Sequence, residues 1–273
     1  MSTSGRSSSR RNFLSRLNAR FPWLKLYFVL FIGIVAILDL LDLTISKTND
    51  SYDRIRIAPM ARHVRITERD IRGKKLIALT FDDGPSPSTT PALLNILKMR
   101  DVPATFFVLG NMARNYPDII KHASEEGHEI ANHTMYHQNL IRISANSVQA
   151  DINESRSVLE GILGQSPSLT RPPYGNINDN VRRSVGTPMI LWSVDTLDWK
   201  TRDPDSILSV AMDEVHDGAI ILMHDIYDTT VSAVPKLIDT MRQNGYEFVT
   251  ISELVKERGI TLEDGAVYYN FRP

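Results

Sequence analysis

The sequence predicts an α/β protein built on a parallel β-sheet, and two observations lead to that class. Between residues 75 and 260, short apolar runs of strand type alternate with longer segments of helical periodicity. Several of the apolar runs are followed directly by Asp or His, and parallel α/β folds place their sites at the carboxyl ends of strands. About seven such units predict a barrel-like sheet that is smaller than the eight-unit barrel.

The first predicted strand is the apolar run 76–79, and Gly84–Pro85 ends the segment that follows it. The next strand, 104–109, stops at Gly110–Asn111, and a short strand at 129–133 leads into a loop. The remaining strands are predicted at 188–194, 219–223 and 247–250.

The segments between these strands have helical periodicity. In the segment 88–100, Pro91 suits the first turn, and Leu93, Leu94 and Leu97 form one apolar face. The same pattern predicts further helices at 117–126, 147–163, 206–215, 231–244 and 252–258. Strands and helices thus alternate through a predicted catalytic domain at 75–260, and we expect residues 261–273 to form a C-terminal tail.

Composition limits the classes of function. The chain has 273 residues, a formal net charge of −1 and no cysteine. Its length suits one catalytic domain and an appendage. The near-neutral charge argues against a general nucleic-acid binder. Without cysteine, any metal must be held by His, Asp or Glu.

The N-terminal appendage has the pattern of a membrane anchor. Residues 1–23 form a basic tail without an acid, and the stretch 24–43 has the ~20 residues that a helix needs to span a bilayer. Its apolar centre alone matches a signal-peptide core in length, but no convincing cleavage site follows. We therefore expect one uncleaved transmembrane signal anchor, a linker at 44–74 and an extracytoplasmic catalytic domain at the cell membrane.

A second export route stays open. The pair Arg10–Arg11 resembles a twin-arginine signal, the mark of proteins that are exported folded. Further basic residues and Pro22 separate this pair from the apolar core, which argues against that route.

The first candidate site residues are the adjacent acids Asp82 and Asp83 at the end of the first strand. Neighbouring side chains on a strand point to opposite faces, but both can reach one cavity where the strand gives way to a turn. Two carboxylates that close need a cation or a guanidinium between them. A bare pair of acids more often belongs to a solvated loop, so the case for a functional site depends on the residues downstream.

His133 and His137 lie four residues apart, and one helical turn would place both on the same face. An isolated pair of this kind is weak support, because most such pairs lie on the surface. Here the pair follows a predicted strand, as Asp83 does. A carboxylate with two imidazoles suits zinc or a similar divalent ion and leaves positions for water and substrate.

Three more segments follow predicted strands or contain rigid loops. Two prolines stiffen 171–175, and the free N–H of Tyr174 is a candidate oxyanion donor, although a surface turn is the commoner reading. The segment 192–199 holds two acids and two tryptophans, which suits a carbohydrate platform or, for Trp192, the core. His224 ends the strand at 219–223; a lone histidine is most often structural.

In this order the segments resemble the polysaccharide deacetylase family over residues 76–258. This family is also called the NodB-homology domain or carbohydrate esterase family 4. The matching motifs are TFDDGP at Thr80, HTMYH at His133, RPPY at Arg171, DTLDW at Asp195 and LMH at Leu222. Gln138 departs from the pattern, since many relatives have proline there. The resemblance implies a distorted (β/α)7 barrel and a metal-dependent N-deacetylase of an N-acetylglucosamine polymer.

The resemblance also implies roles at the metal. Asp83, His133 and His137 would bind a divalent ion, with Zn²⁺ favoured and Co²⁺, Ni²⁺ or Mn²⁺ as alternatives. Asp82 would be the general base, and Arg171 would hold it in place.

Further roles surround the substrate. The Tyr174 amide would stabilise the oxyanion, and His224, oriented by Asp198, would protonate the leaving amine. Leu222 and Trp199 would line the acetyl pocket.

These roles define a hydrolase of linear amides, and the outward-facing anchor favours peptidoglycan as its polysaccharide partner. Chitooligosaccharide, exopolysaccharide and acetylxylan remain alternatives. A non-catalytic carbohydrate-binding relative is disfavoured, because no ligand, base or acid is missing. A metalloprotease is disfavoured, because this sequence lacks the HExxH motif of that class.

Overall fold

The computed structural model describes residues 71–273, and strand β1 (Lys75–Asp82) lies at the centre of its sheet. Every residue of β1 except Lys75 is buried, as expected for a strand covered on both faces. It pairs in parallel with β2 (Thr105–Val108), β6 (Ala219–His224) and β7 (Tyr246–Phe248). The predicted basic tail, the anchor and most of the linker lie outside the described residues.

The main sheet has the order β3-β2-β1-β6-β5, with β7 paired to the start of β1. Strands β3 (Glu129–Asn132) and β5 (Val194–Asp195) end this path. Strands β4 (Met189–Ile190) and β8 (Val267–Tyr268) form a second pair. Every pairing between named strands in the described chain is parallel, which confirms the predicted α/β class.

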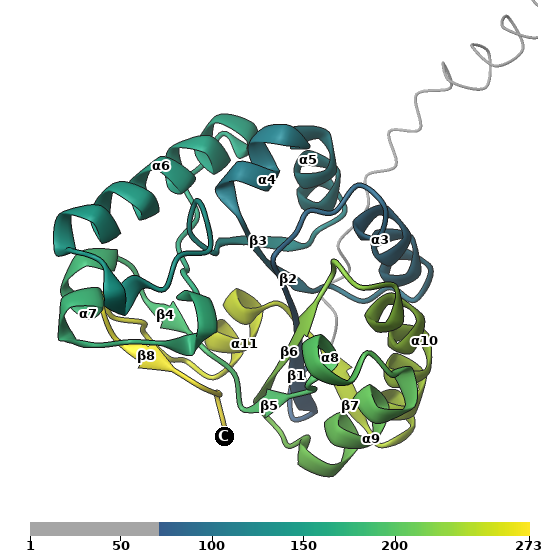
Figure 1. Cartoon of the computed structure of the whole chain (residues 1–273). Coiled ribbons are helices and arrows are strands. Elements are labelled where there is room, and N and C mark those ends of the chain that lie inside the picture. Colours follow the sequence, from purple (N-terminus) through teal and green to yellow (C-terminus); the bar gives the residue numbers. More distant parts are fainter. Residues whose placement is uncertain (1–70) are drawn as a thin grey trace, which may run out of the picture. The chain divides into compact units, whose positions relative to one another are not determined.

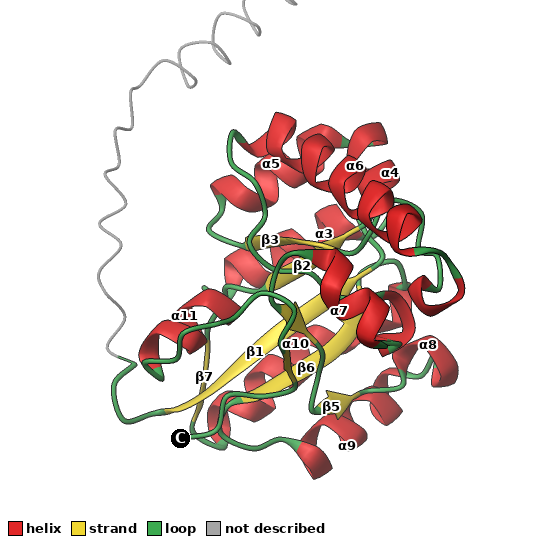
Figure 2. Cartoon of the chain, turned by 90° about the vertical axis from the view of Figure 1, so that its left-hand side faces the viewer, coloured by secondary structure: helices red, strands yellow, loops and turns green. Residues whose placement is uncertain are grey.

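The helices surround the strands (Figure 1), and Figure 2 shows the same arrangement from the side. Six of them correspond to predicted helices, with ends that differ by up to three residues. These are α3 (Thr90–Met99), α5 (Pro117–Glu125), α6 (Ala145–Leu163), α9 (Pro204–Glu214), α10 (Asp228–Gln243) and α11 (Ile251–Glu257). Three shorter helices were not predicted: α4 (Gly110–Asn115), α7 (Asp179–Val185) and α8 (Asp198–Thr201).

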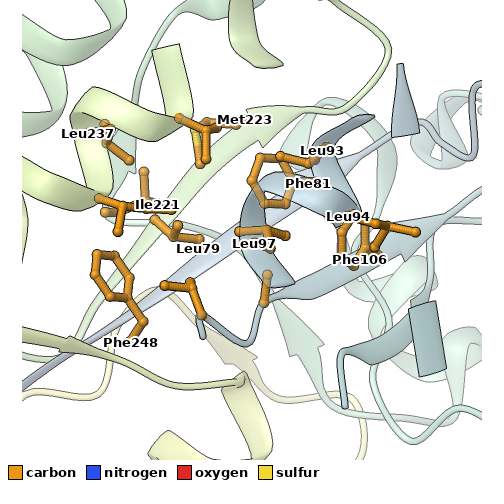
Figure 3. Packing of buried hydrophobic residues seen from close by; sticks show 14 of the residues in the cluster. Leu79, Phe81, Leu93, Leu94, Leu97, Phe106, Ile221, Met223, Leu237 and Phe248 are labelled. Carbon is orange, nitrogen blue, oxygen red and sulfur yellow. The ribbon is translucent and has the colours of Figure 1, made fainter. Parts of the chain in front are cut away.

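The period of two along β1 divides its side chains between two hydrophobic clusters. Leu79 and Phe81 pack in one cluster with residues of α3 and α10 (Figure 3), while Leu76 and Ala78 pack in the other, beside α11. Fully burying an aliphatic or aromatic side chain contributes about 1.5–3 kcal/mol. The same alternation places Thr80 and Asp82 on the face of Leu76 and Ala78, where the site begins.

The end of the domain differs from the expected tail at 261–273. Strand β8 pairs with β4, and Phe271 is buried in the second hydrophobic cluster. The Phe271 N–H donates to the carbonyl of Gly218, a residue with φ +83 whose added Cβ would lie 2.1 Å from the Phe271 carbonyl oxygen. Apolar burial and this close backbone contact therefore make the segment part of the fold.

No helix within residues 71–273 is long and apolar enough to cross a membrane.

Candidate metal centre and active site

A cavity of about 470 Å³ opens at the carboxyl ends of β1, β3 and β6. Eight of the ten predicted site residues line it, and the other two, Arg171 and Asp198, are fully buried and bonded to residues of the lining. The cavity is lined by Asp82, Asp83, His133, His137, Tyr174, Trp192, Asp195, Trp199, Leu222, His224 and Tyr227. A cavity of about 530 Å³ near the starts of β3 and α11 contains none of the predicted residues, so the chemistry belongs to the smaller one.

Asp83, His133 and His137 converge on one point. Oδ1 of Asp83 lies 3.4 Å from Nε2 of His133 and 3.3 Å from Nε2 of His137. This oxygen is buried without a hydrogen-bond partner in the described chain. Ligands held at 2.0–2.1 Å in a tetrahedron lie about 3.3 Å apart, so the separations of Asp83 from the two imidazoles suit zinc, and three protein ligands leave a fourth position for water or substrate.

The two histidines meet through a loop, as predicted after the strand at 129–133, and not through the helical turn that their spacing would also suit. Residues 133–137 follow β3 without helical structure, and Thr134 and His137 have φ values of 75° and 56°. Nδ1 of His133 donates to the carbonyl oxygen of Arg171 at 2.7 Å, which leaves its Nε2 unprotonated and free to bind a metal. The predicted pair is thus brought together, but by a different backbone.

The protonation states of the cluster suit a cation. Burial alone raises the pKa of Asp83, but the neighbouring imidazoles of His133, His137 and His224 lower it to about 2. Burial and the charge of His133 lower the pKa of His137. At neutral pH the cluster therefore offers a carboxylate and neutral imidazole nitrogen, the forms that bind metals.

Asp82 is held by a buried arginine. Nη1 of Arg171 donates to Oδ1 of Asp82 at 2.7 Å and to Oγ1 of Thr80 at 2.9 Å. Its Nε and Nη2 donate to the carbonyl oxygens of Ile190 and Leu191. Oδ2 of Asp82 lies 3.7 Å from Nε2 of His133. The arginine fixes one oxygen, and the other faces the metal cluster.

His224 lines the same cavity and has a carboxylate behind it. Nδ1 of His224 donates to Oδ1 of Asp198 at 2.8 Å, and the buried Asp198 also accepts hydrogen bonds from the His224 and Trp199 N–H groups and the Thr230 hydroxyl. Burial alone lowers the pKa of His224, but the bond to Asp198 and the charges of the site aspartates raise it to about 9. The imidazole is therefore protonated at neutral pH.

Two aromatic residues flank the metal cluster and the acid. Tyr174 has φ 62°, and its ring meets that of His137 edge-on at a centroid distance of 4.7 Å. Trp199, at the start of α8, is 47 % exposed at the cavity. Both line the cavity that contains the metal cluster and His224.

Sequence reasoning missed one residue of the lining, Tyr227, and gave no role in the site to Trp192 or Asp195 beyond a possible carbohydrate platform. Tyr227 lies beside His224, with ring centroids 5.7 Å apart, and the Arg202 guanidinium stacks on it. Trp192 packs against the core, as expected, yet also lines the cavity with Asp195. Tyr227 belongs to no recognised motif, so only the structure could place it.

The fold and the Asp-His-His cluster define an α/β protein with a candidate metal centre. An arginine-held carboxylate and a carboxylate-held histidine lie beside that centre. The family model for polysaccharide deacetylase matches residues 69–187. The chain belongs to the polysaccharide deacetylase family.

Among its relatives is the peptidoglycan-N-acetylmuramic acid deacetylase PdaC of Bacillus subtilis (strain 168), 42% identical over 66% of this chain and 39% of that protein. The peptidoglycan-N-acetylglucosamine deacetylase PgdA of Listeria monocytogenes (strain 10403S) is 42% identical over 72% of this chain and 41% of its own length. The chain thus spans about two fifths of these relatives. The solved structure of the Bacillus subtilis PdaC has a TM-score of 0.67 and 41% identity, covering 68% of this chain and 93% of that one.

Proposed function

We propose that this protein is a metal-dependent hydrolase that removes N-acetyl groups from a cell-wall polysaccharide, with peptidoglycan N-acetylglucosamine as the favoured substrate. One observation carries the proposal: the three-donor cluster, Asp82 and His224 share a single cavity. Amide hydrolysis needs an activated water, a stabilised oxyanion and an acid for the amine. The names of the relatives support the substrate class.

Asp83, His133 and His137 would hold the ion, and Zn²⁺ suits one carboxylate with two imidazoles. When bound, the ion would make water a stronger acid and polarise the acetyl carbonyl. Asp82 would accept the proton of the attacking water through Oδ2, because Arg171 occupies Oδ1. The Arg171 bond fixes the direction of the Asp82 carboxylate.

Addition of hydroxide to the carbonyl carbon places negative charge on the acetyl oxygen. The Tyr174 amide would donate to this oxygen, and the Tyr174 ring lies against that of His137. His224 would then give its proton to the nitrogen as the carbon–nitrogen bond breaks, which releases acetate and the free amine. Asp198 stabilises the imidazolium before that transfer. Leu222 and Trp199 would surround the acetyl methyl group.

Two finer features belong to the same proposal. The main sheet runs from β5 through β6, β1 and β2 to β3. Single bridges then join Thr170 to β3 and to β4, and β4 directly precedes β5 in the chain. This near-closure of the strands favours a distorted (β/α)7 barrel. Residues 24–43 would anchor the protein in the cell membrane with its catalytic domain outside, as the basic tail favours. Protease added to intact cells with an accessible outer face should digest the domain; full protection until lysis would contradict the anchor.

The function is tested by acetate release from purified peptidoglycan, chitooligosaccharides and acetylxylan. We expect zinc-dependent release that is fastest on peptidoglycan and absent after chelation. Mass spectrometry of the digested glycan would place the free amine on glucosamine or muramic acid. Release from none of the three, with zinc bound, would contradict a deacetylase of this class.

A further inference from the structure

The loop from His133 to His137 has a backbone that its own sequence does not favour. Thr134 and His137 lie in the left-handed region, which β-branched and other non-glycine residues rarely adopt. Such a conformation persists only where the surrounding structure imposes it. Since the loop carries two of the three metal donors, whatever imposes its conformation also sets the donor geometry.

The loop backbone is bound from both sides. The N–H of Met135 donates to Oδ1 of Asp151 at 2.6 Å, and the N–H of Thr134 donates to Oδ1 of Asn132 at 2.8 Å. From the other side, the N–H of Gly110, at the start of α4, donates to the Thr134 carbonyl at 2.9 Å. The loop is therefore clamped between α4 and α6.

One face of α6 supplies the clamp. Asp151 and Ser155 lie one helical turn apart, and both are buried. The hydroxyl of Ser155 donates to Oδ1 of Asn132 at 2.8 Å, the same oxygen that accepts the Thr134 N–H. Nδ2 of Asn132 donates to the carbonyl of Ile152, also on α6. Helix α6 thus orients the loop directly through Asp151 and indirectly through Asn132.

Packing alone does not explain the buried carboxylate of Asp151. It is 7 % exposed, and its Oδ2 has no partner in the described chain. Burying a carboxylate costs free energy unless its bonds compensate, and an apolar side chain would fill the same space without that cost. Its Oδ1 accepts the Met135 N–H, which belongs to the loop between the metal donors.

We propose that Asp151 is a positioning residue of the metal centre: by holding the Met135 N–H, it sets the loop that directs His133 and His137 toward Asp83. The inference rests on the metal site of the proposed function. Groups that orient metal ligands typically change metal affinity about 10–100-fold when removed.

The test is the Zn²⁺ affinity of the full chain, measured by competition with a chromophoric chelator at a temperature where each variant is folded. Asp151→Ala should bind Zn²⁺ about 10–100-fold more weakly than the unchanged chain. Asp151→Asn retains an oxygen that can accept the Met135 N–H, so it should recover most of the affinity. Wild-type affinity in Asp151→Ala would overturn the proposal.

Leu159→Ala is the matched structural control, because Leu159 is buried on the same helix and packs in the main cluster. It should lower thermal stability while Zn²⁺ affinity stays unchanged; an equal loss of affinity in both variants would reduce Asp151 to a helix-docking role and refute the proposal. If Asp151→Ala does not fold, Ser155→Ala decides: it should weaken Zn²⁺ binding through Asn132, and unchanged affinity would refute the clamp. An unchanged chain that binds no Zn²⁺ would instead refute the metal site itself.

Discussion

The guanidinium of Arg171 donates to the carboxylate of Asp82 at 2.7 Å, and both side chains are buried. The same arginine accepts a hydrogen bond from His133 through its backbone carbonyl. One residue therefore fixes the proposed base and the tautomer of a proposed ligand. Because the pair is shielded from solvent, removing one partner leaves an uncompensated charge.

Arg171→Met should destabilise the protein by about 3–5 kcal/mol, the usual cost of breaking a buried pair, and lower turnover as Asp82 loses its partner. Denaturant unfolding and acetate release measure the two effects. Arg183→Met, at an exposed position of α7, is the control and should change neither. A folded Arg171→Met variant with full stability and activity would contradict this role.

His224→Ala should keep its zinc and lose turnover on an N-acetyl amide by about 10²–10⁴-fold, the range that general acid catalysis contributes. The loss should be smaller on an activated acetyl ester, since that leaving group needs less protonation. The two rates are compared with those of His122→Ala, an exposed histidine on α5. Equal losses on both substrates would rule against His224 as the acid.

The raised pKa of His224 predicts the alkaline limb of activity. The protonated imidazole is the active form, so turnover should fall as pH rises through about 9. Asp198→Asn removes the charge that raises this pKa, and the limb should move toward the ordinary value of 6.5. The measurement is kcat against pH for both proteins. If the alkaline limb does not move in Asp198→Asn, Asp198 does not raise the pKa of the catalytic acid.

The same shift affects folding. A pKa that is higher in the folded state contributes stability that is fully present below about 6.5 and is lost as pH rises through about 9. Urea midpoints should therefore decline over that interval, and less in His224→Ala than in the unchanged chain. Parallel declines in both would assign the effect to other groups.

The parallel fold and the cluster of site residues were predictable, because strand ends are marked by apolar runs followed by acids or histidines. A loop was predicted after the strand at 129–133, but its left-handed backbone was not, since an interval of four also suits a helical turn. Asn132 holds the Thr134 N–H locally, whereas the contact of Asp151 with the Met135 N–H comes from the following helix α6 and cannot be read from the loop itself. Tyr227 was missed because it belongs to no recognised motif, although it lies only three residues after His224.

The end of the domain shows the same limit. Residues 267–268 are too short a strand to be recognised from periodicity, and their pairing with β4 follows from tertiary packing around Phe271. Short helices such as α8 begin at site residues such as Asp198, so the sequence pattern there reflects chemistry more than helical periodicity.

The central claim is that two adjacent aspartates of identical chemistry have different roles. Asp82 is bonded to Arg171, whereas Asp83 faces the two imidazoles. Asp82→Asn should therefore keep its zinc and lose about 10²–10⁴-fold in activity, and added metal should not restore it. Asp83→Ala should lose zinc and recover part of its activity at high metal concentration.

The deciding measurement is zinc content beside the rate of acetate release for these two variants. The account predicts metal without activity in Asp82→Asn, and weak metal binding with partial rescue in Asp83→Ala. Loss of zinc in Asp82→Asn with zinc retained in Asp83→Ala would reverse the two roles, and full zinc and activity in both would contradict the hydrolase altogether.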